Sequence, residues 1–121
     1  MTVAHLLRAH IGKPIADDIR RAERLLAGGD AQAAALVAAV ALERRLRAVR
    51  PIYAWRGLRA AALSLRAEGI INRKQSIRLR WIAAQRNGLV HGRLTSDVAA
   101  EALVRQIVAF VREVEGSLAH A

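Results

Sequence analysis

Apolar residues recur three or four positions apart along almost the whole chain, and this spacing constrains the fold more than any other feature. It is typical of amphipathic α-helices, in which such residues share one face. Sustained alternation of apolar and polar residues is nearly absent, and aromatic residues, which favour strands, make up only 3% of the chain. The sequence therefore predicts an all-α fold.

Capping residues and helix breakers divide this pattern into separate helices. Pro14 is suited to open the first helix, Asp30 is a good N-cap for the second, and Pro51 should end the second. Gly69 and Gly92 are suited to follow helix C-termini. The helices bounded in this way cover about residues 14–28, 30–50, 55–69, 74–91 and 96–116. Because their connections are short, neighbouring helices should be antiparallel, which predicts an up-down bundle of four to five helices.

Length and composition exclude several classes of protein. The 121 residues fit a single domain, residues 1–121, and the absence of cysteine excludes disulfides, thiolate nucleophiles and cysteine-ligated metals. The longest apolar run, from Ala33 to Leu42, is shorter than the roughly 20 residues of a membrane-spanning helix. The N-terminus lacks the pattern of a signal peptide. We therefore expect a cytoplasmic protein without membrane contact.

Positive charge is concentrated in the middle of the chain. The net charge is +10, and residues 44–93 hold thirteen basic groups against one acid, Glu68. A focused positive field attracts polyanions, so nucleic acid is the natural class of partner. Two other interpretations stay open. A compositional bias towards arginine would explain the arginines but not the missing acids, and an acidic protein could be the partner instead of nucleic acid.

The expected helix over residues 74–91 carries apolar side chains on two opposite faces. Ile77 and Trp81 belong to one face, and Leu79 and Ile82 belong to the other. One face can pack on the core, whereas the second needs a further helix of this chain or a second chain. With so few aromatic residues, we expect both tryptophans of the chain to take core roles.

Arg86 lies on one of these apolar faces, where a charged side chain is costly unless it is paired or functional. It could pair with Glu43, although that acid could equally be solvated at the edge of its own helix. Asn87 and His91 are four residues apart and share a face. Arg86 and His91 are five apart, so an ideal helix separates them by about 140°. Convergence of the two requires the helix to loosen near Gly88 or to end at His91.

The segment from Arg86 to Gly92 resembles the signature of the HEPN superfamily, in which an arginine and a polar residue precede a histidine. Arg86, Asn87 and His91 fit that motif with four residues between the arginine and the histidine, and the helical frame over most of residues 30–118 fits as well. The resemblance implies a small helical bundle that forms a homodimer. Many HEPN domains are metal-independent endoribonucleases of toxin–antitoxin and other defence systems. Others are non-catalytic modules that bind RNA or nucleotides or organise larger complexes.

The resemblance assigns a catalytic site to Arg86, Asn87 and His91. In such a ribonuclease the 2′-hydroxyl of the RNA attacks the adjacent phosphorus, which requires proton transfer and positive charge. Histidine suits proton transfer near neutral pH, and arginine suits a permanent phosphate clamp. A homodimer would supply the second set of groups that in-line attack requires, with no metal and no cofactor. The expected substrate is tRNA or other single-stranded RNA.

Further basic residues near this motif are candidates for RNA contact, although a solvated face explains them equally well. They are Arg73, Lys74, Arg78, Arg80 and Arg93. Glu43 is the candidate supporting acid. Arg93 stands where one large toxin group has a tyrosine that a partner nucleotidyltransferase modifies. That form of inhibition is therefore in doubt, while an antitoxin or nucleotidyltransferase partner stays open.

Overall fold

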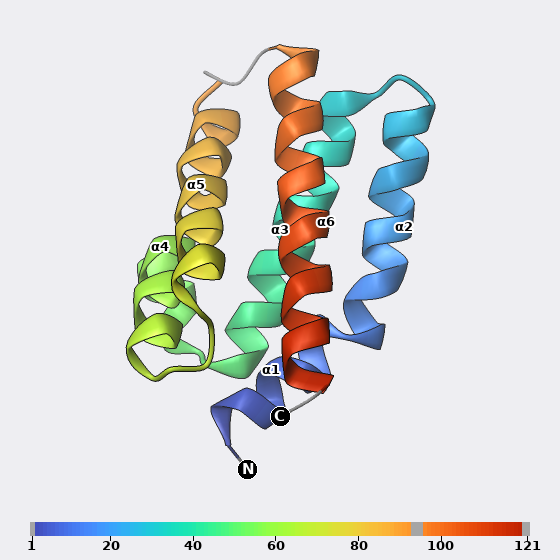
Figure 1. Ribbon diagram of the computed structural model, residues 1–121. Helices are drawn as coiled ribbons and strands as arrows, with labels where there is room; N and C mark the ends of the chain where they lie inside the picture. The colour runs from blue at the N-terminus through green and yellow to red at the C-terminus, as the bar shows by residue number, and fades with distance from the viewer. Residues whose placement is uncertain (1, 93–95, 120–121) are drawn as a thin grey trace.

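A computed structural model describes residues 2–92 and 96–119, and within them the chain is all-helical, with no β-strand (Figure 1). The prediction of an all-α fold is confirmed. The helices are α1 (Val3–Ile11), α2 (Lys13–Ala27), α3 (Ala31–Val49), α4 (Ile52–Ala67), α5 (Arg73–Val90) and α6 (Asp97–Ala119). Five of them follow the predicted ranges closely, and α1 is an additional helix that the sequence analysis did not include.

The helix ends follow local chemistry. The side chain of Asp30 accepts a hydrogen bond from the backbone N–H of Ala33 at 3.2 Å, so it is the N-cap that the sequence predicts. Asn72 and Gln75 form a reciprocal capping box at the start of α5, with hydrogen bonds of 2.8 and 2.9 Å. Gly92 follows α5 with a φ of 71°, a conformation that favours glycine. These caps fix where α5, which carries the motif, begins and ends.

Helix α3 is at the centre of the fold, where it contacts α1, α2, α4 and α6. Figure 1 shows α6 in front of α3, with α2 on one side and α5 on the other. The buried face of α3 includes Ala34, Ala35 and Ala38, whose small side chains allow neighbouring helices to approach closely. Its larger residues Leu36 and Val40 are instead 51% and 37% exposed. The helix is central, and alanines cover much of its inward surface.

The hydrophobic core joins helices that are distant in sequence. Its largest fully buried side chains include Leu42 of α3, Leu79 and Ile82 of α5, and Ile107 and Phe110 of α6. Burying side chains of this size stabilises a fold by about 1.5–3 kcal/mol each. Helix α5 contacts both α4 and α6, so its orientation is fixed on two sides.

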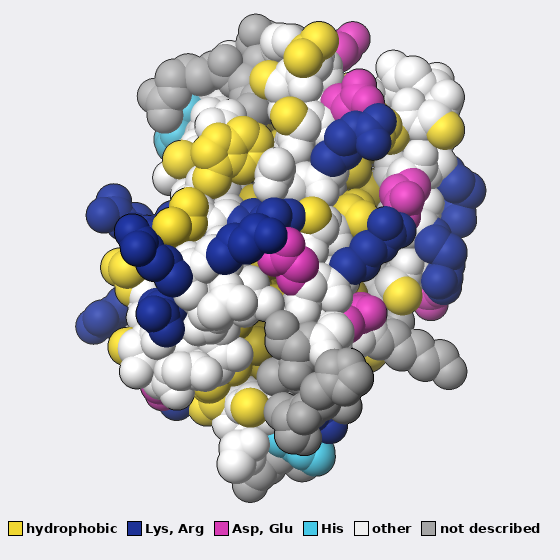
Figure 2. Space-filling view, viewed as in Figure 1, with side chains coloured by type: hydrophobic (Ala, Val, Ile, Leu, Met, Phe, Trp, Pro, Cys, Tyr) yellow, Lys and Arg dark blue, Asp and Glu magenta, His cyan; other side chains and the backbone are white. Residues whose placement is uncertain are grey.

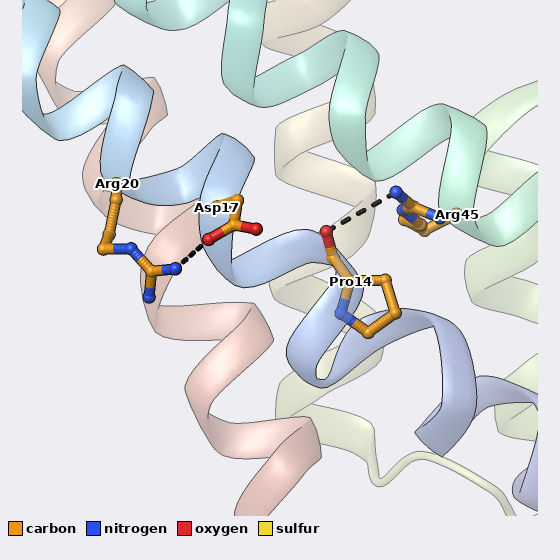
Figure 3. A network of polar contacts seen from close by, with 4 residues as sticks. All are labelled: Pro14, Asp17, Arg20 and Arg45. Atoms are coloured by element: carbon orange, nitrogen blue, oxygen red, sulfur yellow. Dashed lines mark hydrogen bonds and ion pairs between the residues drawn. The ribbon is translucent and has the colours of Figure 1, made fainter.

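Polar contacts add to this packing at the helix ends. Arg45 of α3 donates a hydrogen bond to the backbone carbonyl of Pro14 at 3.4 Å, next to the exposed Asp17–Arg20 ion pair of α2 (Figure 3). Arg45 is one of the thirteen basic residues between positions 44 and 93, and this hydrogen bond gives it a structural role. No helix in the described part of the chain is both long and apolar enough to cross a membrane.

Candidate functional site

Helix α5 buries one of its two apolar faces and leaves the other uncovered. Leu79 and Ile82 are fully buried, whereas Ile77 is 48% and Trp81 39% exposed. Figure 2 shows hydrophobic side chains gathered over α5, with Lys and Arg side chains beside them. The expectation that both tryptophans are core residues is therefore wrong for Trp81, because the neighbouring helices cover only the opposite side of α5. The side chain of Trp55 lies outside the described residues.

Arg86 projects from the packed side of α5 towards α3, where it forms a two-pronged ion pair with Glu43. Its Nε donates to Oε1 of the carboxylate, and its Nη2 donates to Oε2 at 3.1 Å. The side chains of Arg86 and Glu43 are 35% and 20% exposed. Of the two interpretations of Glu43, the pairing with Arg86 is the one found. The pair compensates the charge on an otherwise apolar face.

Asn87 and His91 are exposed at the C-terminal end of α5. His91 is the C-cap residue, and its backbone N–H donates to the carbonyl of Asn87 at 3.1 Å. Helix α5 does not loosen near Gly88, whereas it does end at His91, which is the second condition for convergence; the side chain of Arg86 is nevertheless paired with Glu43 of α3.

A cleft of ≈ 340 Å³ lies between α3, α4 and α5. Arg86 and Asn87 line it, but His91 does not. Its remaining lining residues come from α3, the first half of α4 and one position of α5, and they are Glu43, Leu46, Arg47, Tyr53, Arg56, Gly57, Leu58, Arg59 and Ala83. Within one chain, the structure thus brings two of the three motif residues to the same cleft and leaves the histidine outside it.

The shape of this cleft depends on a kink in α4. Gly57 has φ 80° and ψ −173°, which interrupts the helix between Ile52 and Ala67. A positive φ of this size is accessible to glycine with little strain. Arg56 and Arg59 lie on either side of the kink and both line the cleft. Neither arginine stands out in the sequence as a site residue, and the only sequence signal for them is the excess of basic residues in the middle of the chain.

The candidate RNA-contact residues of α5 divide into two groups. Lys74 and Arg78 point towards α6, where their terminal nitrogens lie 3.8 and 3.1 Å from a carboxylate oxygen of Glu113. Arg73 and Arg80 are exposed and lie on the same side of α5, since seven residues rotate a helix by about 700°. These four basic residues of α5 therefore form two patches, and Glu113 partly neutralises one of them.

Arg93, the remaining candidate, lies outside the described residues. Among the residues that the structure describes, no group of three or more His, Cys, Asp or Glu side chains is placed to hold a metal ion. Comparison with protein-family models, with curated proteins and with solved structures gave no match for this chain.

Proposed function

We propose that this chain is a HEPN-type, metal-independent endoribonuclease, a toxin or defence effector that cleaves tRNA or other single-stranded RNA. The observation that carries the proposal is the arrangement of α5. The helix exposes His91 and Asn87 at one end of an uncovered apolar face, while Arg86 is held beside a cleft rich in arginine. Groups suited to proton transfer and to phosphate binding thus lie on one helix, five residues apart.

In this proposal RNA supplies its own nucleophile. A base takes the proton of the 2′-hydroxyl, the 2′-oxygen attacks phosphorus, and the 5′-oxygen leaves with a proton from an acid. The products are a 2′,3′-cyclic phosphate and a 5′-hydroxyl. His91 is the group suited to proton transfer, Arg86 stabilises charge on the phosphoryl oxygens, and Asn87 orients the imidazole or the phosphate.

A two-fold homodimer over the exposed face of α5 completes the proposed site. Ile77, Trp81 and His91 lie within about 80° of one another around the helix, so the same contact would bury the two apolar residues and bring two histidines together. The partner chain would then supply a second histidine beside His91, at the C-terminal end of the exposed face of α5. The central position of α3 and the contacts of α5 with α4 and α6 support an up-down arrangement of antiparallel helices in each protomer.

A second candidate function, a non-catalytic module that binds RNA or nucleotides, is favoured by one specific observation. The guanidinium of Arg86 is already engaged by both carboxylate oxygens of Glu43, and His91 does not line the cleft beside which Arg86 is held. An arginine held in this way organises the cleft without needing to contact a reacting phosphate.

Incubation of the purified protein with tRNA in the presence of EDTA tests the proposal. Cleavage that leaves cyclic-phosphate ends is expected for the unchanged protein and should be lost in His91→Ala and in Arg86→Ala. His5→Ala, at an exposed histidine of α1, is the matched control and should cleave normally. Each variant is compared by circular dichroism so that loss of fold is recognised.

Either of two results would refute the ribonuclease. One is cleavage that persists in His91→Ala, and the other is no cleavage by a folded dimer that binds RNA. The second result would favour the non-catalytic module, whose RNA affinity should survive His91→Ala.

A further inference from the structure

We propose that the cleft between α3, α4 and α5 binds a phosphate group, and that Arg47, Arg56 and Arg59 hold it. None of these arginines belongs to the motif on α5. Because Arg86 and Asn87 of the motif line the same cleft, the inference rests in part on the proposed function, although phosphate binding by the three arginines requires no cleavage.

The charge of the cleft lining favours an anion. Four arginines line the cleft, and Glu43 is the one acid among its lining residues. Since Glu43 is paired with Arg86, it does not neutralise the other three. In the described part of the chain, no ion pair joins Arg47, Arg56 or Arg59 to a carboxylate. Like charges gathered around a concave, partly apolar surface focus a positive potential into it.

The kink at Gly57 places the start of a helical segment at the same cleft. Because the φ of 80° interrupts α4, residues 58–67 begin a new helical segment. The first N–H groups of a helical segment have no carbonyl partner within it, and the helix dipole is positive at that end. Gly57, Leu58 and Arg59 all line the cleft, so this segment starts at the wall of the cleft. Phosphate groups are commonly bound at such helix starts.

Tyr53 provides an independent indication that a ligand belongs here. Its side chain is 5% exposed and lines the cleft, and its hydroxyl is buried with no hydrogen-bond partner among the described residues. Buried polar groups are almost always hydrogen-bonded, so this buried hydroxyl beside the cleft lacks an acceptor that a ligand can supply. A phosphate oxygen can accept its hydrogen bond once the hydroxyl turns towards the cleft, while the arginines neutralise the phosphate charge.

The volume of the cleft, ≈ 340 Å³, exceeds what inorganic phosphate alone fills and falls at the lower end of small-molecule sites. The phosphate could therefore belong to a free nucleotide or to an RNA strand. Both sources share the chemistry that Arg56, Arg59 and Tyr53 recognise, and binding experiments can separate them.

Isothermal titration calorimetry with adenosine 5′-monophosphate, with adenosine and with a short 2′-O-methyl RNA tests the inference. The methylated RNA lacks the nucleophilic hydroxyl, so the ribonuclease proposal can fail without affecting this test. We expect the monophosphate or the RNA to bind and adenosine not to bind. Arg56→Gln and Arg59→Gln should each weaken binding by about tenfold or more, and Tyr53→Phe by about three- to tenfold.

Arg66→Gln is the control, since Arg66 is an exposed arginine of α4 that does not line the cleft and its substitution changes the net charge equally. Binding of the monophosphate would assign the site to a free nucleotide, and binding of the RNA alone would assign it to a strand. The inference is overturned if neither binds to folded protein, if adenosine binds as well as its monophosphate, or if Arg66→Gln weakens binding as much as Arg56→Gln.

Discussion

The Glu43–Arg86 pair is predicted to couple α3 to α5 more strongly than a surface ion pair would. The perturbation is a double-mutant cycle of Glu43→Ala, Arg86→Ala and the double variant. In the single variants, the remaining charge lies on a partly buried surface without its partner, because Glu43 is only 20% exposed. The double variant removes both charges, so its loss of unfolding free energy should be smaller than the sum of the single losses.

The size of the coupling free energy depends on the burial and geometry of the pair. Exposed pairs contribute about 0.2–1 kcal/mol, whereas a hydrogen bond to a charged group contributes about 1.5–3 kcal/mol. Glu43 and Arg86 form two such hydrogen bonds but are 20% and 35% exposed, so solvent still screens them. We therefore expect a coupling free energy of about 1–2 kcal/mol, between the two limits.

Urea denaturation of the four proteins, followed by circular dichroism, measures this coupling. The pair Glu101–Arg105 on α6 is the internal control, since it is spaced i, i+4 with side chains 43% and 69% exposed. The double-mutant cycle of this control pair should give a coupling free energy of about 0.5 kcal/mol or less. A coupling for Glu43 and Arg86 that is no larger than the control would refute the view that this pair positions Arg86.

Three further predictions concern α5. Leu79→Ala should lower the free energy of unfolding by about 3–5 kcal/mol because Leu79 is fully buried, and a loss below about 1 kcal/mol in urea denaturation would contradict its place in the core. Asn72→Ala removes the capping box and should cost about 1 kcal/mol, seen as a lower thermal midpoint; an unchanged midpoint would argue against the cap. Trp81→Ser should convert the proposed homodimer to monomer in sedimentation velocity with little loss of stability, whereas an unchanged dimer would place the interface elsewhere.

The helices themselves were predictable because their signals are local. Asp30, Asn72 and Gly92 act within a few residues of their own position, so the printed sequence contains the interactions that begin or end α3 and α5. Helix α1 was missed because Gly12 and Pro14 limit it to nine residues, and its identity as a helix depends on the burial of Leu7 and Ile11 against the rest of the fold.

The candidate site was only partly predictable. The two faces of α5 and the unusual position of Arg86 followed from helical periodicity, and so did the angle that separates Arg86 from His91. Helical periodicity did not predict which face of α5 the neighbouring helices cover. Trp81 was expected in the core, but it is exposed. Periodicity identifies opposite faces, but only the placement of α4 and α6 decides which of them meets solvent.

The sequence by itself determined that this protein is all-helical, where five of its helices lie, and that its positive charge is concentrated between residues 44 and 93. Only the tertiary structure decided which charges meet. It paired Arg86 with Glu43 across 43 positions of sequence and Arg78 with Glu113 on another helix. It also brought Arg47, Arg56 and Arg59 to one cleft through the kink at Gly57. Contacts between distant helices depend on packing and on single backbone torsions, and neither is encoded in a local pattern.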